Sequence, residues 1–513
     1  MKESLTDKKE VKGEEDLGSG FVEAGEDKKT YSNLKTVLKT LGSILVLLGV
    51  IMFSLLVVAS VFGEFNVIIP LVFTAIVSLA SGLALRSSFK YAKEPELKHA
   101  MVCAALAWLV VPAFSSLLFF LIAGMNPLDS FFEAMSGWTG TGLTMIAHPS
   151  KLTHTMQFWR SLMQWLGGVG VIVLMISILA RPGTGAYSLY KAEAREERIK
   201  PSIISTVRMT WWIYLLLTAF GILLLFFAGM SPWGAINHAM TAIGTGGFTI
   251  TDESIASYND SLIELAIIPI MVLGAIPFLV HYRVLKGNIK ALFKDVQVRA
   301  FVVILFILLI ILFAANYSLY GDVLGCLRFS SFQLISGLTC TGFQTTNVLG
   351  WSSTGLIILC TNMIIGGGMG STAGGVKLIR AVIAYKWIGW SLRRNFLPPK
   401  AIIGVRLGDR LLEKEEVVKI VSEASLIIIL WLLFLLAGIC VLSTVVGSQF
   451  QLGDVMLEVA SAQGNVGLST GITNAGMSGV GKIMLILNMW IGRLEIIPIL
   501  MLFRVFVKGF RPI

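Results

Sequence analysis

Four short glycine-centred turns are the segments of this chain best suited to hold a dehydrated cation. Each lies between two apolar stretches of membrane-spanning length, and each has a glycine at the same aligned position, followed by leucine or phenylalanine. Four backbone turns that converge on one axis can offer rings of carbonyl oxygens in place of an ion's water. The turns are TGTGLT (139–144, turn 1), GTGGFT (244–249, turn 2), TCTGFQ (339–344, turn 3) and GNVGLS (464–469, turn 4).

The predicted cation ligands are the main-chain carbonyls of four residues in each turn, namely the aligned glycine and the three residues before it. Carbonyl oxygens have modest field strength and no fixed charge that would trap an ion. Glycine permits positive φ and, having no side chain, leaves the axis open. One such glycine alone would more simply indicate close helix packing, but four aligned turns favour an ion filter. The predicted binding residues are Thr139, Gly140, Thr141 and Gly142 in turn 1, Gly244, Thr245, Gly246 and Gly247 in turn 2, Thr339, Cys340, Thr341 and Gly342 in turn 3, and Gly464, Asn465, Val466 and Gly467 in turn 4.

A second glycine-rich segment, 366–375, interrupts the apolar stretch 354–388. Each glycine costs a helix about 1 kcal/mol relative to alanine, so this run cannot continue a straight helix. Composition alone leaves two interpretations open, a packing kink and a flexible loop. A nucleotide-binding P-loop is excluded, because GxxxxGK[ST] is absent and the segment lies at membrane depth.

Arg493 lies within the last apolar stretch, where a charge costs about 2.5–3.5 kcal/mol on insertion scales. Glu495 is only two residues further on and points to a different face of the helix, so it is not the natural partner. We expect Arg493 to face the ion path below the turns and to bind carbonyls of segment 366–375. The alternative is a buried ion pair that holds the fold together.

Other charged residues lie near the turns. Glu133 and Glu458 occupy matching places before turns 1 and 4, where they can either brace the turns through hydrogen bonds or attract cations. Arg160 and Lys482 lie at the ends of apolar stretches, and we expect them to snorkel toward water. The histidines are scattered, HExxH and GxSxG are absent, and no CxxC occurs, so neither an enzyme nor a metal centre is predicted.

The scaffold that positions these residues must be a polytopic membrane protein. Of its 513 residues, 55% are hydrophobic and only 14% are charged, and the mean hydropathy is +0.79. A soluble protein of this size could not bury so many apolar side chains. A spanning helix needs about 20 apolar residues. We predict ten spans, at 40–62, 67–85, 101–123, 161–180, 209–230, 261–280, 300–320, 354–388 (interrupted), 424–447 and 483–505.

The distribution of basic residues predicts the orientation. Lysine and arginine gather in alternate linkers and in the C-terminal tail, whereas the linkers that carry the four turns hold only Lys151 and Arg328. This positive-inside pattern places both termini in the cytoplasm and the turns toward the outer side. The net charge of +10 therefore reflects topology, and no nucleic-acid partner is predicted. Residues 1–38 have no apolar core and form a cytoplasmic tail, not a signal peptide.

Each turn is preceded by a short helix that enters the membrane only part of the way. Asn126 and Ser231, each followed by proline, predict where the first and second of these short helices begin. Asp454 predicts the start of the fourth, and Ser330 is the best candidate for the start of the third. Non-helical backbone at membrane depth must line a cavity. A helix that stops there places the negative, C-terminal end of its dipole inside the membrane, which favours a cation.

These four turns, GGGMGSTAGGVK (366–377) and IGRLEI (491–496), resemble the Trk/Ktr/HKT superfamily of potassium transporters. The extra N-terminal hairpin makes the chain most similar to TrkH/TrkG-type subunits, from residue 40 to the C-terminus. The resemblance implies an all-α fold with four pseudo-symmetric helix–pore-loop–helix repeats around one pore. It also implies potassium at the turn carbonyls, since serine at the first aligned glycine accompanies sodium permeation in this superfamily, and all four positions are glycine here.

The resemblance further implies a gate made of Arg493 and the residues Gly366, Gly367, Gly368, Gly370, Ser371, Thr372, Gly374 and Gly375. It implies a homodimer in the cell (inner) membrane that binds a cytoplasmic RCK-type regulatory ring, and nucleotide would act only through that partner. No covalent cofactor is expected. The predicted domains are a tail (1–38), a hairpin (39–97) and four pore repeats (98–200, 201–295, 296–412 and 413–513).

Other functions compete with channel-like potassium uptake. A sodium-permeable relative is disfavoured by the four glycines, whereas a cation-coupled symporter of the same superfamily remains an alternative, because the sequence does not show whether transport is passive or coupled to sodium or protons. A secondary transporter with inverted repeats would have two halves of opposite topology, whereas these four repeats share one topology. An intramembrane enzyme would need paired catalytic groups within the spans, which Arg493 and Glu264 alone do not provide.

Overall fold

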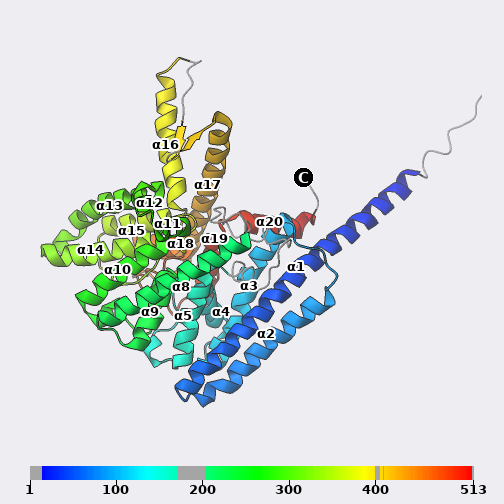
Figure 1. The fold of residues 1–513 in the computed structure, drawn as a ribbon, viewed down its shortest axis with the longest axis horizontal. Coiled ribbons are helices and arrows are strands. Elements are labelled where there is room, and N and C mark those ends of the chain that lie inside the picture. The colour runs from blue at the N-terminus through cyan, green and yellow to red at the C-terminus, as the bar shows by residue number, and fades with distance from the viewer. Residues whose placement is uncertain (1–13, 171–202, 399–404, 408–409, 511–513) are drawn as a thin grey trace, which may run out of the picture.

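The computed structural model describes residues 14–170, 203–398, 405–407 and 410–510 of the chain (Figure 1). These residues form helices apart from one antiparallel pair of short strands, β1 (Val405–Leu407) and β2 (Arg410–Leu412). Within the described residues, six helices are long and apolar enough to cross a membrane, or eight if each of two sharply bent helix pairs counts as one span. Apart from this pair of short strands, the described residues thus form an all-helical membrane protein.

An N-terminal helical hairpin, α1 (Glu14–Val61) with α2 (Ile68–Ser88), lies along one side of the molecule (Figure 1). Its helices approach so closely that a Cβ on Gly82 would lie 2.7 Å from the Gly42 carbonyl oxygen. Small residues let membrane helices pack backbone to backbone. The Ser78 hydroxyl also donates to the Leu45 carbonyl across the pair, at 2.9 Å.

The remaining helices form four units with the same order: a long helix, a short helix, a glycine turn and a second helix. Each long helix packs on the short helix of its own unit. The units are α3 (Leu97–Ile122), α4 (Pro127–Thr139) and α5 (His154–Val169); α8 (Ile203–Phe227), α9 (Pro232–Ile243) and α10 (Ser261–Ala275); α13 (Val296–Tyr320), α14 (Val323–Leu338) and α15 (Ser353–Ile365); and α17 (Lys414–Val445), α18 (Leu452–Gly464) and α19 (Gly479–Leu494).

The four units close into a ring. The second helix of each unit packs on the short helix of the next, so that α5 contacts α9, α10 contacts α14, α15 contacts α18, and α19 returns to α4. Two ion pairs cross these junctions, Arg328 with Glu264 and Lys482 with Asp129. The first and last units of the chain are therefore neighbours in space, although more than 300 residues separate α4 from α19.

The short helices begin largely where their capping residues predict. Asn126 accepts from the Asp129 amide at 3.0 Å and Ser231 from the Gly234 amide at 3.1 Å, each before a proline. In α18 the Asp454 carboxylate accepts from the amide of Gln451, which is the residue that precedes the helix. The third start was predicted wrongly, because Asp322 caps α14 and Ser330 lies inside it.

Every second helix is too short to cross a membrane alone, with 16, 15, 13 and 16 residues in chain order. The predicted spans 261–280 and 483–505 are not continuous. After α10 the chain turns by 104° into α11 (Phe278–Leu285), and after α19 by 110° into α20 (Ile497–Lys508). Pro277, which cannot donate an amide, lies in the first break, and Glu495 and Ile496 take positive φ in the second.

In the third unit the break is the glycine-rich loop, which leads from α15 into α16 (Leu378–Asn395). Here α16 and the start of α17 run side by side and project beyond the other helices (Figure 1). The fourth predicted span, 161–180, continues α5 into residues that lie outside the described part. The other short elements are η1 (Phe65–Val67), η2 (Pro149–Lys151), η3 (Ser254–Tyr258) and α12 (Lys290–Lys294).

Candidate cation-binding turns and the loop beneath them

The four turns have the same backbone conformation. In each one, the amide just before the aligned glycine donates to a carbonyl five residues earlier, at 2.8–2.9 Å. The residue two positions before the glycine is left-handed, which ends the short helix as a Schellman-type cap does. These left-handed residues are Gly140 (φ 69°), Thr245 (φ 49°), Cys340 (φ 56°) and Asn465 (φ 52°).

The aligned glycines lie against one another's turns in cyclic order. All four have positive φ, between 75° and 103°. A Cβ added to any of them would lie within 2.4 Å of a carbonyl oxygen in the next turn, a separation that no real structure tolerates. The pairs are Gly142 with Gly246 O (2.3 Å), Gly247 with Thr341 O (2.0 Å), Gly342 with Val466 O (1.9 Å) and Gly467 with Thr141 O (2.4 Å). The turns therefore form a closed ring in which only glycine fits.

A second aligned position lies on the short helices, nine residues before each glycine. Its occupants are fully buried in all four units: Glu133, His238, Gln333 and Glu458. Glu133 accepts from the Thr144 hydroxyl and the Met145 amide, both at 2.9 Å. Glu458 accepts from the Ser469 hydroxyl at 2.8 Å and from the amides of Thr470 and Thr473 at 3.1 and 3.0 Å. Both glutamates thus brace the backbone just after their turns.

Arg160 does not snorkel, contrary to the sequence-based expectation. Its side chain is 2% exposed, pairs with Glu133 at 2.9 Å, donates to the Thr249 carbonyl at 2.9 Å and stacks over Phe248. It joins turn 1 to turn 2. Lys482 is likewise buried, because it pairs with Asp129 and donates to the Ala475 carbonyl. Both side chains face neighbouring units rather than lipid. The place of a residue along a predicted span does not show which way its side chain points.

Gln164 is a further residue that sequence reasoning missed. Its amide nitrogen donates to the Gly246 carbonyl at 2.6 Å, and its amide oxygen accepts from the Phe248 amide at 2.9 Å. It follows Arg160 by four residues, which places both on one face of α5. The sequence contained the signal, because Gln157, Arg160 and Gln164 recur at helical spacing within one predicted span and its N-terminal end. Gln333 and His238 could likewise have been found by aligning the segments before the four turns.

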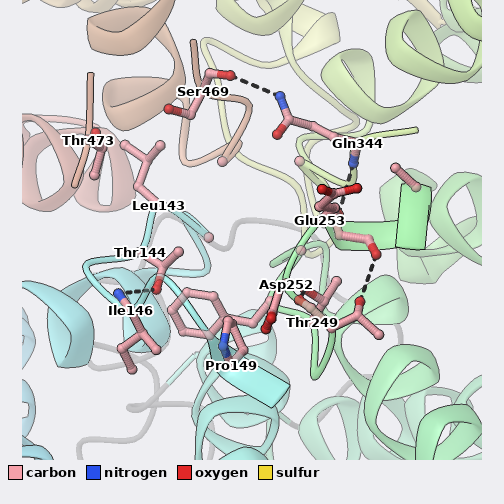
Figure 2. Close-up of a pocket in the computed structure, with 18 of the residues that line it drawn as sticks. Leu143, Thr144, Ile146, Pro149, Thr249, Asp252, Glu253, Gln344, Ser469 and Thr473 are labelled. Carbon is pink, nitrogen blue, oxygen red and sulfur yellow. Dashed lines mark hydrogen bonds between the residues drawn. The ribbon is translucent and has the colours of Figure 1, made fainter. Parts of the chain in front are cut away.

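On one side of the ring the turns open into a cavity of about 460 Å³ (Figure 2). Loops of different units meet around it. The Ala256 amide donates to the Gln344 carbonyl, and the Gln344 side chain donates to the Ser469 carbonyl, both at 3.0 Å. Asp252 accepts from the Ser150 amide and contacts His148. Burial raises the pKa of the Asp252 carboxyl, but hydrogen bonds from Ser150 and His148 outweigh it and lower that pKa overall.

The glycine-rich loop packs against the opposite side of the ring. The Thr372 hydroxyl is 2.9 Å from the Ile243 carbonyl oxygen, 2.8 Å from that of Gly274 and 3.2 Å from the Thr245 hydroxyl. At the other end of the loop, the Gly375 amide donates to the Gly464 carbonyl at 3.0 Å. The loop is therefore bonded to the second and fourth units directly beneath turns 2 and 4.

Arg493 bonds to the glycine-rich loop, as expected from the sequence. Its guanidinium donates to the Thr372 carbonyl at 3.3 Å and to the carbonyls of Gly167 and Gly168 in the first unit. Glu495 pairs instead with Arg380 at the start of α16. Arg493 thus connects the loop of the third unit with the first and fourth units. Within the described residues, no group of three or more His, Cys, Asp or Glu side chains could hold a metal ion.

Comparison with known families gives one match that covers most of the chain. Residues 65–509 match the TrkH family, described as cation transport proteins. An uncharacterized cation transporter of Methanocaldococcus jannaschii is 36% identical over 92% of this chain and 96% of its own length. The Trk system potassium uptake protein TrkH of Escherichia coli is 31% identical over 80% of this chain and 86% of its own.

Solved structures give the same result. The crystal structure of the potassium transporter TrkH from Vibrio parahaemolyticus superposes with a TM-score of 0.78 at 27% sequence identity. The superposition covers 91% of this chain and 98% of that one, so the likeness extends over nearly the whole molecule.

Proposed function

The chain belongs to the TrkH family of cation transport proteins, and on this premise we propose that it carries potassium across a cell membrane through one pore whose filter is the ring of glycine turns. It is a multi-pass membrane transport protein and not an enzyme. The observation that carries the proposal is the cyclic contact between turns, in which each aligned glycine abuts a carbonyl of the next turn. A closed ring of four backbone segments is the arrangement that can surround a single ion.

Two further features support a cation as the transported species. All four short helices end at the ring, so the negative ends of their dipoles lie beside it. The ligands offered are main-chain carbonyls, which suit an ion that is held weakly enough to leave. Potassium is favoured because each aligned position is glycine and because several similar proteins are named as potassium uptake proteins.

In this proposal the four units are pore repeats, at 98–200, 201–295, 296–412 and 413–513, and the hairpin at 39–97 is an accessory. The distribution of basic residues orients the cavity of Figure 2 toward the outer side and both termini toward the cytoplasm. The membrane is then the cell (inner) membrane. Lipid would contact the apolar side chains exposed on α13 and α17.

The glycine-rich loop and Arg493 form the proposed gate. The loop lies beneath the ring and is bonded to it by Thr372 and Gly375, and Arg493 holds the Thr372 carbonyl. Its many glycines let it move at little steric cost once those bonds break. A positive charge in a poorly screened path also opposes cation passage.

The proposed partners are a second copy of the chain and a cytoplasmic RCK-type regulatory ring. Relatives are named as parts of a Trk system, and the projecting pair α16 and α17 offers basic residues on the side proposed to be cytoplasmic. Arg393 and Arg394 end α16 there. No cofactor is bound by the chain in this proposal, and nucleotide acts through the ring.

Ion flux into liposomes that contain the purified protein tests the function. Saturable potassium uptake that exceeds sodium uptake, with and without imposed sodium or proton gradients, is the expected result. Uptake that requires one of those gradients would replace the channel-like mechanism with a coupled one. Equal sodium and potassium uptake would identify a sodium-permeable relative. Absence of any cation flux would contradict the proposal itself.

A further inference from the structure

The two buried glutamates behind the ring differ in electrostatic balance. Glu133, behind turn 1, has Arg160 at 2.9 Å, so the pair is neutral. Glu458, at the equivalent position behind turn 4, is equally buried. Its oxygens are bound by hydroxyl and amide donors, and no ion pair joins it to a Lys, Arg or His among the described residues. Hydroxyl and amide donors stabilise a carboxylate but do not cancel its charge.

The other two members of this position carry no charge. Gln333 is neutral and donates weakly to the Thr345 hydroxyl at 3.5 Å. Nδ1 of His238 lies 2.8 Å from the Gly234 carbonyl oxygen, which can only accept, so Nδ1 carries the proton. Nε2 of His238 has no hydrogen-bond partner among the described residues, and a second proton there would leave a buried, unpaired positive charge. Both oxygens of Glu458 accept from amide or hydroxyl donors, which favours its ionised form, so the four residues at this position contribute one net negative charge, at turn 4.

We propose that Glu458 determines the cation affinity of the ring, as a positioning residue that braces turn 4 and as the charged member of this aligned position that has no ion-pair partner among the described residues. The proposal rests on the proposed function, since it requires a cation in the ring. Glu458 does not ligate the ion. Its negative charge adds to the electrostatic attraction between the ion and the carbonyls of turn 4. Those carbonyls alone would attract the ion less strongly.

The physical argument is one of screening. A charge excluded from water interacts several times more strongly with a nearby ion than an exposed charge does. A carboxylate in direct contact with the ion would hold it too long for conduction, whereas one placed behind the turn strengthens attraction without occupying a ligand position. Arg160 cancels the same contribution at turn 1.

The chain provides its own charge-swap experiment. Glu458→Gln installs at turn 4 the side chain that turn 3 already has, and Gln333→Glu does the reverse. The measurement is the potassium concentration that gives half-maximal uptake in liposomes, with maximal rate normalised to folded protein. We expect Glu458→Gln to raise the half-saturating concentration about tenfold. The double variant Glu458→Gln/Gln333→Glu, with one charge moved to turn 3, should return most of the way to the parent value.

A purely structural brace predicts the opposite for the double variant, which would then be at least as impaired as either single change. That result would overturn the proposal, as would an unchanged half-saturating concentration in folded Glu458→Gln. If Gln333→Glu does not fold, a second pair decides. Glu133→Gln leaves Arg160 unbalanced and should weaken affinity, and Glu133→Gln/Arg160→Gln should restore it; no restoration would count against the charge argument.

Failure of this inference is distinct from failure of the proposed function. Parent protein that takes up potassium, with Glu458→Gln of unaltered affinity, would remove only the role of Glu458. Parent protein without saturable cation uptake would overturn both.

Discussion

The two sides of the ring of units are built differently. On the side of the cavity, the four turns share one backbone conformation and one cyclic contact, and each turn is held by the next. On the opposite side, the second helices end in three different ways. One runs into residues outside the described part, two bend by 104° and 110°, and only the third leads into a loop beneath the ring.

This difference separates two requirements of an ion pathway. A filter must present equivalent ligands on all sides, so four copies of one turn serve it well, and the copies hold one another by close backbone contact. A gate needs only one element that can move, and the proposed gate is accordingly the loop of the third unit alone. The bonds of Thr372 and Arg493 connect that element to the second, first and fourth units.

The largest effect is expected from breaking the ring itself. In Gly342→Ser the new Cβ would lie 1.9 Å from the Val466 carbonyl oxygen, closer than at any other aligned glycine, and φ is positive. We expect the ratio of potassium to sodium permeability to fall about tenfold or more, which corresponds to about 1.4 kcal/mol of selectivity. Gly142→Ser should lower this ratio less. Gly471→Ser is the control, since φ is also positive there but nothing lies within 4 Å. Unchanged permeability ratios in all four aligned variants would remove the filter assignment.

The next effect concerns the side with the single loop. Arg493→Ala removes a positive charge from the proposed path and frees the Thr372 carbonyl, so potassium flux at saturation should rise several-fold. Arg493→Lys keeps the charge but loses the planar set of donors, and it should give an intermediate flux. Deletion within 366–375 should act in the same direction. Flux normalised to folded dimer is the measurement, and a decrease on that scale in Arg493→Ala would show a structural role instead.

A third effect should follow from the helix into which the loop leads. Reversal of Arg393, Arg394 and Lys400 to glutamate should weaken co-purification with an RCK-type ring, because basic side chains near the end of α16 are the proposed contact. Lys400 itself lies outside the described residues. The matched control is reversal of Lys286 and Lys290 in another basic linker. Full binding by the triple variant at several salt concentrations would exclude this surface.

The smallest effect concerns the hairpin that lies outside the ring. Glu64 accepts from the amides of His154 and Thr155 and from the Thr155 hydroxyl, and so ties the hairpin to the start of α5. Burial raises the Glu64 pKa, but these hydrogen bonds outweigh it, and the pKa is lowered overall. A lowered folded pKa gives stability that is present above the unfolded value of about 4.3 and is lost as pH falls through the folded value.

Glu64→Gln should therefore lower the free energy of unfolding at pH 7 by about 1–2 kcal/mol. The difference from the parent should shrink as pH falls from about 5 to below 4. Thermal melts over that range measure it, with Glu253→Gln on an exposed loop as the control. A difference that stays constant with pH would show that the charge of Glu64 does not contribute, and no difference at any pH would show that the hairpin is held by its apolar contacts alone.

Much of the architecture followed from local signals. The caps at Asn126 and Ser231, the four aligned glycines, the N-terminal hairpin and the interruption at 366–375 depend on residues close in sequence, and the structure contains each of them. Asp322 was missed as the third cap because no proline marks the helix start. The break after α10 was missed because that stretch remains apolar through the bend, and the break after α19 was missed although Arg493 and Glu495 interrupt the apolar stretch there.

The sequence by itself determined that the protein is membrane-embedded, that four equivalent turns exist and that their aligned residue is glycine, since hydropathy, capping and positive φ are local properties. The order in which turns meet, the burial of Arg160 between units and the unequal charges behind turns 1 and 4 were decided only by the tertiary structure. The order of the turns and the place of Arg160 depend on contacts between residues about 90 to more than 300 positions apart, and the charge difference depends on Arg160 reaching Glu133 on another helix, 27 positions away. Such contacts form when the ring closes, and no local pattern specifies which partner each side chain will meet.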